Sequence, residues 1–169
     1  DGKRYRDGLS GIAVNGLGHN HPKLVKAISE QAGKLIHTSN LYGVVEQSNL
    51  ADRLCEISGM DEAFFCNSGA EANEAAIKLA KYFGHKKGIE NAKIIVMERA
   101  WHGRTLATLA ATDSPKAKIG FGDLPSGFVR VPYKNFAAIE QAADDNPEIQ
   151  AVLLEVLQGE GGINVADTE

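Results

Sequence analysis

Short apolar runs that alternate with helix-like stretches are the feature that most constrains the fold of this sequence. Runs of this kind lie at 63–66, 93–97, 128–131 and 151–155, and helical spacing of apolar residues returns between them. Strands that alternate with helices predict an α/β fold, in which a mostly parallel sheet is flanked by helices. Ligands of such sheets bind beyond the carboxyl ends of the strands, so we expect functional residues in the loops there.

Helical patterns occupy most of the remaining chain, and several carry their own start and stop signals. Ser68 and Glu71 form a capping-box pattern behind the first apolar run, and Gly84 is expected to end the helix that follows. Asn135 is the expected N-cap of a later helix. In chain order, helices are predicted over 22–35, 46–58, 69–83, 105–111 and 136–143.

The composition excludes several classes of function. The formal charge of −4 lacks the basic excess of a nucleic-acid binder. No apolar run approaches the roughly 18 residues of a membrane span, and we expect no secretory leader. Cys55 and Cys66 are too few for a disulfide framework and suit a reducing compartment. We therefore expect a cytoplasmic protein with no nucleic-acid, membrane or metal partner.

The loop after the first apolar run has the features of an anion site. Small residues at 68–70 leave the first N–H groups of the following helix uncovered, at the positive end of its dipole. Phosphate commonly binds at such helix starts. The alternative is that Ser68 only caps the helix and Gly69 only eases a turn, and this loop alone favours that alternative.

The loop after the second apolar run carries the only tryptophan of the chain. Trp101 can stack on a planar ligand, and the guanidinium of Arg104 suits a carboxylate. The alternatives are a hydrophobic plug for Trp101 and a salt bridge at a helix start for Arg104. For His102, a packed or hydrogen-bonded histidine is the favoured interpretation.

The loop after the last apolar run is rich in glycine and contains two carboxylates, Glu155 and Glu160. A carboxylate that closes a buried strand is unusual, although some such groups only anchor loops. The three loops together offer an anion site, a ring for stacking and a guanidinium. They indicate a planar phosphorylated ligand and a substrate that bears a carboxylate.

The residues of these loops resemble one protein family. The stretch 64–78 (FFCNSGAEANEAAIK) strongly resembles the class III, or ornithine-type, pyridoxal-phosphate aminotransferases. The stretch 101–105 (WHGRT) resembles the family's aromatic-His-Gly pattern. The stretch 155–162 (EVLQGEGG) is similar to its Glu-Pro-x-Gln-Gly-Glu-Gly-Gly sequence, with Val156 where proline is usual, and residues 1–22 also fit.

Within the family, the stretches 73–76, 105–112 and 127–133 most resemble the acetylornithine branch. This resemblance implies transfer of the terminal amino group of N-acetylornithine to 2-oxoglutarate, in arginine biosynthesis, by a cytoplasmic homodimer that uses pyridoxal 5'-phosphate. A sibling enzyme acting on succinylornithine, ornithine or 4-aminobutyrate is an alternative. Two further alternatives are a non-catalytic phosphate-binding α/β fragment and a module that mainly mediates dimerisation.

The resemblance also assigns roles to individual residues. Gly69 and Ala70, with Ser68 beside them, are expected to hold the cofactor phosphate, and Trp101 to stack on the pyridine ring. His102 and Glu155 are the other expected cofactor-binding residues. The expected substrate-binding residues are Arg104, Glu160 and Tyr42. Arg104 is expected to bind the α-carboxylate, and Glu160 resembles a gating carboxylate.

Two parts of such an enzyme are not found in this sequence. In the family, an Asp that pairs with the pyridine nitrogen follows a later strand, and the Schiff-base lysine comes later still. No lysine here lies in a motif that resembles that site. We therefore expect a segment of a longer protein without activity of its own. It would comprise an N-terminal segment over 1–45 and an incomplete large domain of fold type I over 46–169.

Overall fold

The computed structural model describes residues 1–167, and its contacts divide the chain into two units. The units are Asp1–Ala63 and Phe64–Glu169. No helix within residues 1–167 is both long enough and apolar enough to cross a membrane.

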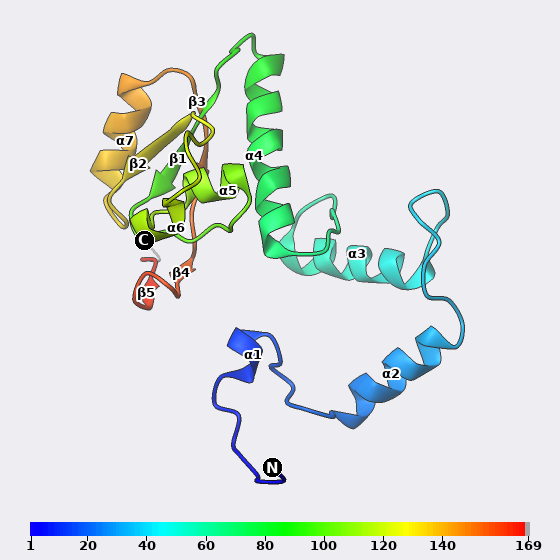
Figure 1. The fold of residues 1–169 in the computed structure, drawn as a ribbon. Coiled ribbons are helices and arrows are strands. Elements are labelled where there is room, and N and C mark those ends of the chain that lie inside the picture. Colours follow the sequence, from blue (N-terminus) through cyan, green and yellow to red (C-terminus); the bar gives the residue numbers. More distant parts are fainter. Residues whose placement is uncertain (168–169) are drawn as a thin grey trace. The chain divides into compact units, whose positions relative to one another are not determined.

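The first unit contains three helices joined by irregular segments (Figure 1). They are α1 (Ser10–Ala13), α2 (Pro22–Ala32) and α3 (Val45–Ser58). Proline at the first position starts α2, as expected, but the helix ends three residues before the predicted boundary. The last residue of α3 is followed by Gly59, whose φ of 70° is the left-handed conformation that suits a glycine C-cap.

The second unit is a parallel sheet flanked by helices, which confirms the predicted α/β class (Figure 1). Its strands run in the order β2-β1-β3, with β1 parallel to both neighbours, and β4 and β5 form a separate antiparallel pair. The elements are α4 (Gly69–Lys86), β1 (Lys93–Met97), α5 (Leu106–Ala111), α6 (Pro115–Lys118), β2 (Phe128–Val131), α7 (Phe136–Asp145), β3 (Ile149–Leu153), β4 (Leu157–Gln158) and β5 (Asn164–Val165).

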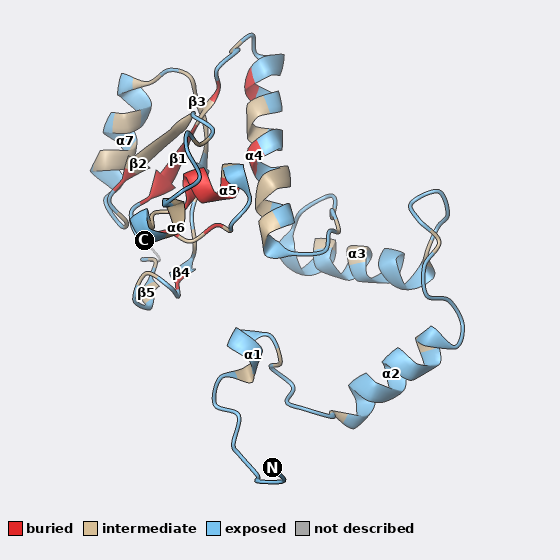
Figure 2. Ribbon diagram, viewed as in Figure 1, coloured by how far each residue is buried: buried red, intermediate tan, exposed pale blue. Residues whose placement is uncertain are grey.

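The core lies on the two faces of β1, the central strand (Figure 2). Successive side chains of a strand point to opposite faces, so β1 packs against α4 and α5 on one side and against α7 on the other. Each fully buried aliphatic side chain contributes about 1.5–3 kcal/mol. The first cluster comprises Ile77, Ile94, Val96 and Ala111, and the second comprises Ile95, Met97, Ala100 and Val131.

Two predictions about local structure are wrong. The apolar run 63–66 is not a buried strand, since it pairs with no strand among residues 1–167, and the side chain of Phe64 is 75% exposed. A run of apolar residues makes a strand only when a neighbour completes its hydrogen bonds. Gly84 does not end its helix, because α4 continues to Lys86. A Cβ at Gly84 would lie 2.5 Å from the Cβ of Ala92, so this glycine allows close packing.

The remaining strand and helix predictions agree with the structure to within two residues. The strands at 93–97 and 128–131 are confirmed, and β3 begins and ends two residues before the predicted 151–155. Asn135 caps α7 by accepting a hydrogen bond from the amide of Ala138. The short elements α1, α6, β4 and β5 were not predicted, because two to four residues are too few to show a period.

Candidate functional site

The first two loops meet at the start of α4. The side-chain amide of Asn73 donates a hydrogen bond of 2.8 Å to the carbonyl oxygen of His102, and the hydroxyl of Thr105 donates to Glu74. Gly103 has a φ of 134°, and a Cβ there would lie 3.0 Å from the Cβ of Ala70. Close backbone approach therefore places the loop 98–104 directly beside the start of α4.

The N-terminus of α4 is capped and open. The hydroxyl oxygen of Ser68 accepts a hydrogen bond from the amide of Glu71, as the capping-box pattern predicts. The carboxylate of Glu71 accepts from the amide of Asn67, at 2.7 Å, rather than from Ser68 itself. Gly69 is exposed, and a Cβ there would meet no atom within 4 Å. The first turn of this 18-residue helix thus presents N–H groups and the positive dipole end to an anion.

Trp101, in the second loop, is hydrogen-bonded to the third loop. Its backbone amide donates a hydrogen bond of 3.1 Å to the carboxylate of Glu155. Burial raises the pKa of Glu155, and the hydrogen bond from Trp101 acts in the opposite direction. The guanidinium carbon of Arg104 lies 5.2 Å from the centroid of the indole ring, which is a cation–π contact. Trp101, the predicted stacking residue, and Arg104, the residue predicted to bind a carboxylate, are therefore neighbours.

His102 is buried and incompletely hydrogen-bonded. Its backbone amide donates to the hydroxyl of Thr112 at 2.9 Å, whereas its ring Nε2 has no partner within residues 1–167. Burial, and secondarily the charge of Arg130, lower the pKa of His102 to about 4. The imidazole is consequently neutral at pH 7.

A hollow of about 400 Å³ lies beside the indole of Trp101. Arg104 and Glu160 both line it, so the structure brings together three residues that the sequence singled out from two different loops. Sequence reasoning missed the contribution of α6 and the loop after it, since these residues form no motif. The lining residues are Trp101, Arg104, Leu109, Ser114, Lys116, Ala117, Phe121 and Glu160.

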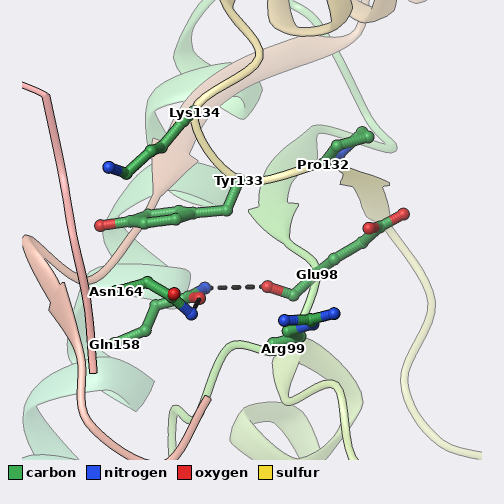
Figure 3. A pocket seen from close by; sticks show the side chains of 7 residues that line it. All are labelled: Glu98, Arg99, Pro132, Tyr133, Lys134, Gln158 and Asn164. Atoms are coloured by element: carbon green, nitrogen blue, oxygen red, sulfur yellow. Dashed lines mark hydrogen bonds between the residues drawn. The ribbon is translucent and has the colours of Figure 1, made fainter. Parts of the chain in front are cut away.

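A second, smaller pocket of about 220 Å³ shows how the third loop is fixed (Figure 3). Gln158 is fully buried, and its side-chain amide donates a hydrogen bond of 2.8 Å to the carbonyl of Glu98. The hydroxyl of Tyr133 donates to the carbonyl of Glu155 at 2.9 Å. A Cβ at Gly161 would lie 2.7 Å from the carbonyl oxygen of Arg99, so this glycine permits the close approach. Sequence reasoning missed the roles of Gln158 and Tyr133, because their hydrogen bonds run to backbone carbonyls.

One candidate residue belongs to the other unit. Tyr42 lies in the first unit, and its side chain is 70% exposed. Its predicted role in substrate binding stays a prediction. Within residues 1–167, no three His, Cys, Asp or Glu side chains are grouped as a metal site.

These features define an α/β protein whose loops can bind an anion, a planar ring and a carboxylate. The whole chain, residues 1–169, matches the family model for class III aminotransferases, and the chain belongs to this family. It is 62% identical to acetylornithine aminotransferase 1 of Bordetella parapertussis, over 98% of this chain and 42% of that protein. It is 55% identical to acetylornithine aminotransferase of Methanocaldococcus jannaschii, over 100% of this chain and 42% of that protein.

Solved structures agree with the family. The ornithine aminotransferase of Toxoplasma gondii, whose active site holds pyridoxal phosphate at partial occupancy, matches with a TM-score of 0.88 and 31% identity, over 94% of this chain and 38% of that chain. An (S)-enantioselective ω-transaminase of Thermomicrobium roseum matches with a TM-score of 0.86 and 32% identity, over 97% and 42%. The chain spans about two fifths of the length of the curated relatives it matches.

Proposed function

We propose that this chain forms part of an enzyme that transfers the terminal amino group of N-acetylornithine to 2-oxoglutarate with pyridoxal 5'-phosphate. The observation that carries the proposal is the convergence of the second and third loops on one hollow, where Arg104 lies against the ring of Trp101 and Glu160 shares the lining. The acetylornithine aminotransferases among its relatives support this choice of substrate.

The residues at the start of α4 and in the next loop fit the cofactor. Gly69 and Ala70 offer backbone N–H groups to the phosphate, with Ser68 as the cap, and the indole of Trp101 offers a face for the pyridine ring. His102 and Glu155 are further proposed cofactor-binding residues, and the carboxylate of Glu155 accepts a hydrogen bond from the amide of Trp101. When bound, pyridoxal phosphate supplies an electrophilic carbonyl carbon and an electron-withdrawing ring for amino transfer.

Arg104 and Glu160 are the proposed substrate-binding pair. The planar guanidinium of Arg104 can donate two parallel hydrogen bonds to the α-carboxylate, which orients the terminal amine of the substrate away from it. Glu160 lines the same hollow and can pair with a cation when no substrate carboxylate is present. Tyr42 is a further proposed contact, contributed by the first unit.

The proposal extends to parts of the enzyme beyond this site. We propose that the Schiff-base lysine is not among the lysines of this chain, so that the chain alone is inactive. The segment 1–45 would lead into a large domain that includes 46–169. We further propose a cytoplasmic homodimer in arginine biosynthesis. The free thiols of Cys55 and Cys66 suit a reducing compartment, and the exposed apolar side chains of the first unit suit a subunit interface.

Replacing Arg104 tests the substrate role in the full-length protein. In Arg104→Ala, loss of a charged hydrogen-bond pair should raise the KM for N-acetylornithine about 10- to 100-fold. Arg104→Lys should restore part of this loss. Arg99→Ala is the matched control from the same loop, because Arg99 lines the other pocket, and its KM should stay within about twofold of wild type. An unchanged KM in Arg104→Ala would exclude this role.

The alternative functions are separated by two measurements on the same protein. Steady-state rates with N-acetylornithine, succinylornithine, ornithine and 4-aminobutyrate as amino donors distinguish the sibling enzymes. Quenching of tryptophan fluorescence by pyridoxal phosphate, but not by nucleotides, distinguishes an aminotransferase from a general phosphate-binding domain. Binding of nucleotides alone would contradict the proposal.

A further inference from the structure

We propose that Arg130 and Asp113 are positioning residues that fix the loop 98–104 and thereby hold Trp101 in place for the cofactor. This inference rests on the proposed function, because it assigns these two residues a task at the same site. Neither side chain lines the hollow beside Trp101, and the sequence analysis assigned neither residue a role.

Arg130 lies on β2, and its guanidinium joins the end of β1 to the end of α5. One terminal nitrogen donates to the carbonyls of Met97 at 3.0 Å and Ala111 at 3.1 Å. The other donates to the carbonyls of Ala110 at 3.2 Å and Thr112 at 3.3 Å. The last carbonyls of a helix lack intrahelical partners and attract a cation, so Arg130 acts as a C-terminal cap of α5.

Asp113 connects this guanidinium to the start of the loop. One carboxylate oxygen lies 3.4 Å from Nε of Arg130, and the other accepts a hydrogen bond of 2.7 Å from the amide of Arg99. The amide of Asp113 in turn donates to the carbonyl of Ala100 at 2.8 Å. The two residues that precede Trp101 are therefore both bonded to Asp113.

The backbone at the start of the loop needs such support. Arg99 has a φ of 59°, a left-handed conformation that non-glycine residues adopt at a cost. The bond from its amide to Asp113 holds it there, and the pair is only partly exposed, at 25% for Arg130 and 30% for Asp113. Without this pair, Arg99 can relax to an ordinary conformation, which would turn the following indole away from its present position.

The same contacts reach the far side of the loop. Thr112, whose carbonyl accepts from Arg130, is fully buried, and its hydroxyl accepts from the amide of His102. The charge of Arg130 also contributes to the lowered pKa of His102, after burial. Arg130 is thus linked to the residues on both sides of Trp101, to Ala100 through Asp113 and to His102 through Thr112. Only an arginine fork can serve these carbonyls and Asp113 together, which lysine cannot do.

The experiment compares three variants of the full-length protein. Arg130→Met removes the charge and the fork, and Arg130→Lys keeps the charge. Lys93→Met is the matched control, because Lys93 lies at the opposite end of β1 and makes its own ion pair with Glu148, at 3.5 Å. For each variant we would measure the melting temperature, the dissociation constant of pyridoxal phosphate and amide hydrogen exchange over 98–104.

Arg130→Met should weaken pyridoxal phosphate binding about tenfold and speed exchange over 98–104, since small displacements of a binding group are costly. Arg130→Lys should lie between Arg130→Met and wild type. Lys93→Met should bind pyridoxal phosphate as wild type does, even where its melting temperature falls as far. Wild-type affinity in Arg130→Met, or losses of affinity that simply follow melting temperature in all variants, would overturn the inference.

The outcomes also separate this inference from the proposed function. If Arg130→Met does not fold, Arg130→Lys against Lys93→Met gives the same comparison. If the wild-type protein binds no pyridoxal phosphate, the proposed function fails. Exchange over 98–104 in the variants then still decides whether Arg130 fixes the loop, and equal protection in Arg130→Met and wild type would refute that.

Discussion

The two units of the chain use their apolar residues differently. In Asp1–Ala63, no residue is buried, and α2 leaves Ile28 60% exposed although its apolar positions follow a regular helical stripe. In the second unit, β1 is buried over four of its five residues, and Ile95 is 1% exposed. A periodic stripe therefore predicts a helix, but burial also needs an opposing surface. In the second unit the sheet provides that surface.

Matched truncations provide the most sensitive test of this contrast. Ile95→Ala should destabilise the second unit by about 2–5 kcal/mol, because it leaves a cavity between β1 and α7. Ile28→Ala should change stability by no more than about 0.5 kcal/mol, as expected for an exposed site. The measurement is the denaturant dependence of hydrogen exchange at the amides of β1 and α2 in the full-length protein. An equally large loss in Ile28→Ala would show that α2 is buried in the whole protein, and the contrast would fail.

Much of the fold followed from the sequence, for physical reasons that also explain the failures. The strand 93–97 and the α7 helix were predicted because an apolar run and an N-cap at Asn135 are local signals. The run 63–66 has an equally clear local signal and forms no strand, because pairing depends on a neighbour distant in sequence. Local sequence pattern therefore predicted helices and strands best where the segments that pair or pack with them lie within residues 1–167.

The candidate site shows the same division. Ser68, Trp101 and Arg104 were found from residue type and position at strand ends, and the structure brings the loops of all three together. Arg130 and Asp113 could not be found in this way, because an arginine in a strand and an aspartate after a helix are ordinary. Their contacts run to backbone carbonyls and amides, which carry no sequence signal.

Substitutions at two glycines, one in each unit, test the same comparison with smaller expected changes in stability. Gly84→Ala should destabilise α4 by about 1–3 kcal/mol despite the better helix propensity of alanine, since the new Cβ would lie 2.5 Å from that of Ala92. The new Cβ of Gly59→Ala would meet no atom within 4 Å. Holding alanine at the φ of 70° should nevertheless cost about 1 kcal/mol of stability. Thermal unfolding measures both changes.

Asparagine at the same two positions distinguishes the causes. Gly59→Asn should be milder than Gly59→Ala, because asparagine tolerates the left-handed conformation. Gly84→Asn should be worse than Gly84→Ala, because the side chain is larger and the space is filled. If asparagine were milder at both sites, the distinction between packing in the second unit and conformation in the first would be lost.

The titration of His102 and of Asp7, one group from each unit, gives the finest comparison. In the second unit, the pKa of His102 is about 4 in the folded state and 6.5 ordinarily, so the unfolded chain binds the proton first as the pH falls. His102 therefore costs stability progressively between pH 6.5 and about 4, and none above. In the first unit, the hydrogen bond from His19 and those from the amides of Ser10 and Leu9 lower the pKa of Asp7. Its contribution is present above pH 3.8 and is lost as the pH falls further.

His102→Gln removes the titrating ring and isolates the first of these windows. Between pH 6 and 5, the free energy of unfolding of wild type should fall relative to His102→Gln, by no more than about 1.4 kcal/mol per pH unit for one proton. Asp7→Asn, the control from the first unit, should leave the difference from wild type unchanged across this range, because the window of Asp7 lies below it. Urea unfolding at four pH values between 4 and 7.5 measures both differences. A wild-type curve parallel to that of His102→Gln would mean that the ring is not buried as a neutral base, whereas a slope in Asp7→Asn would place part of the pH response in the first unit.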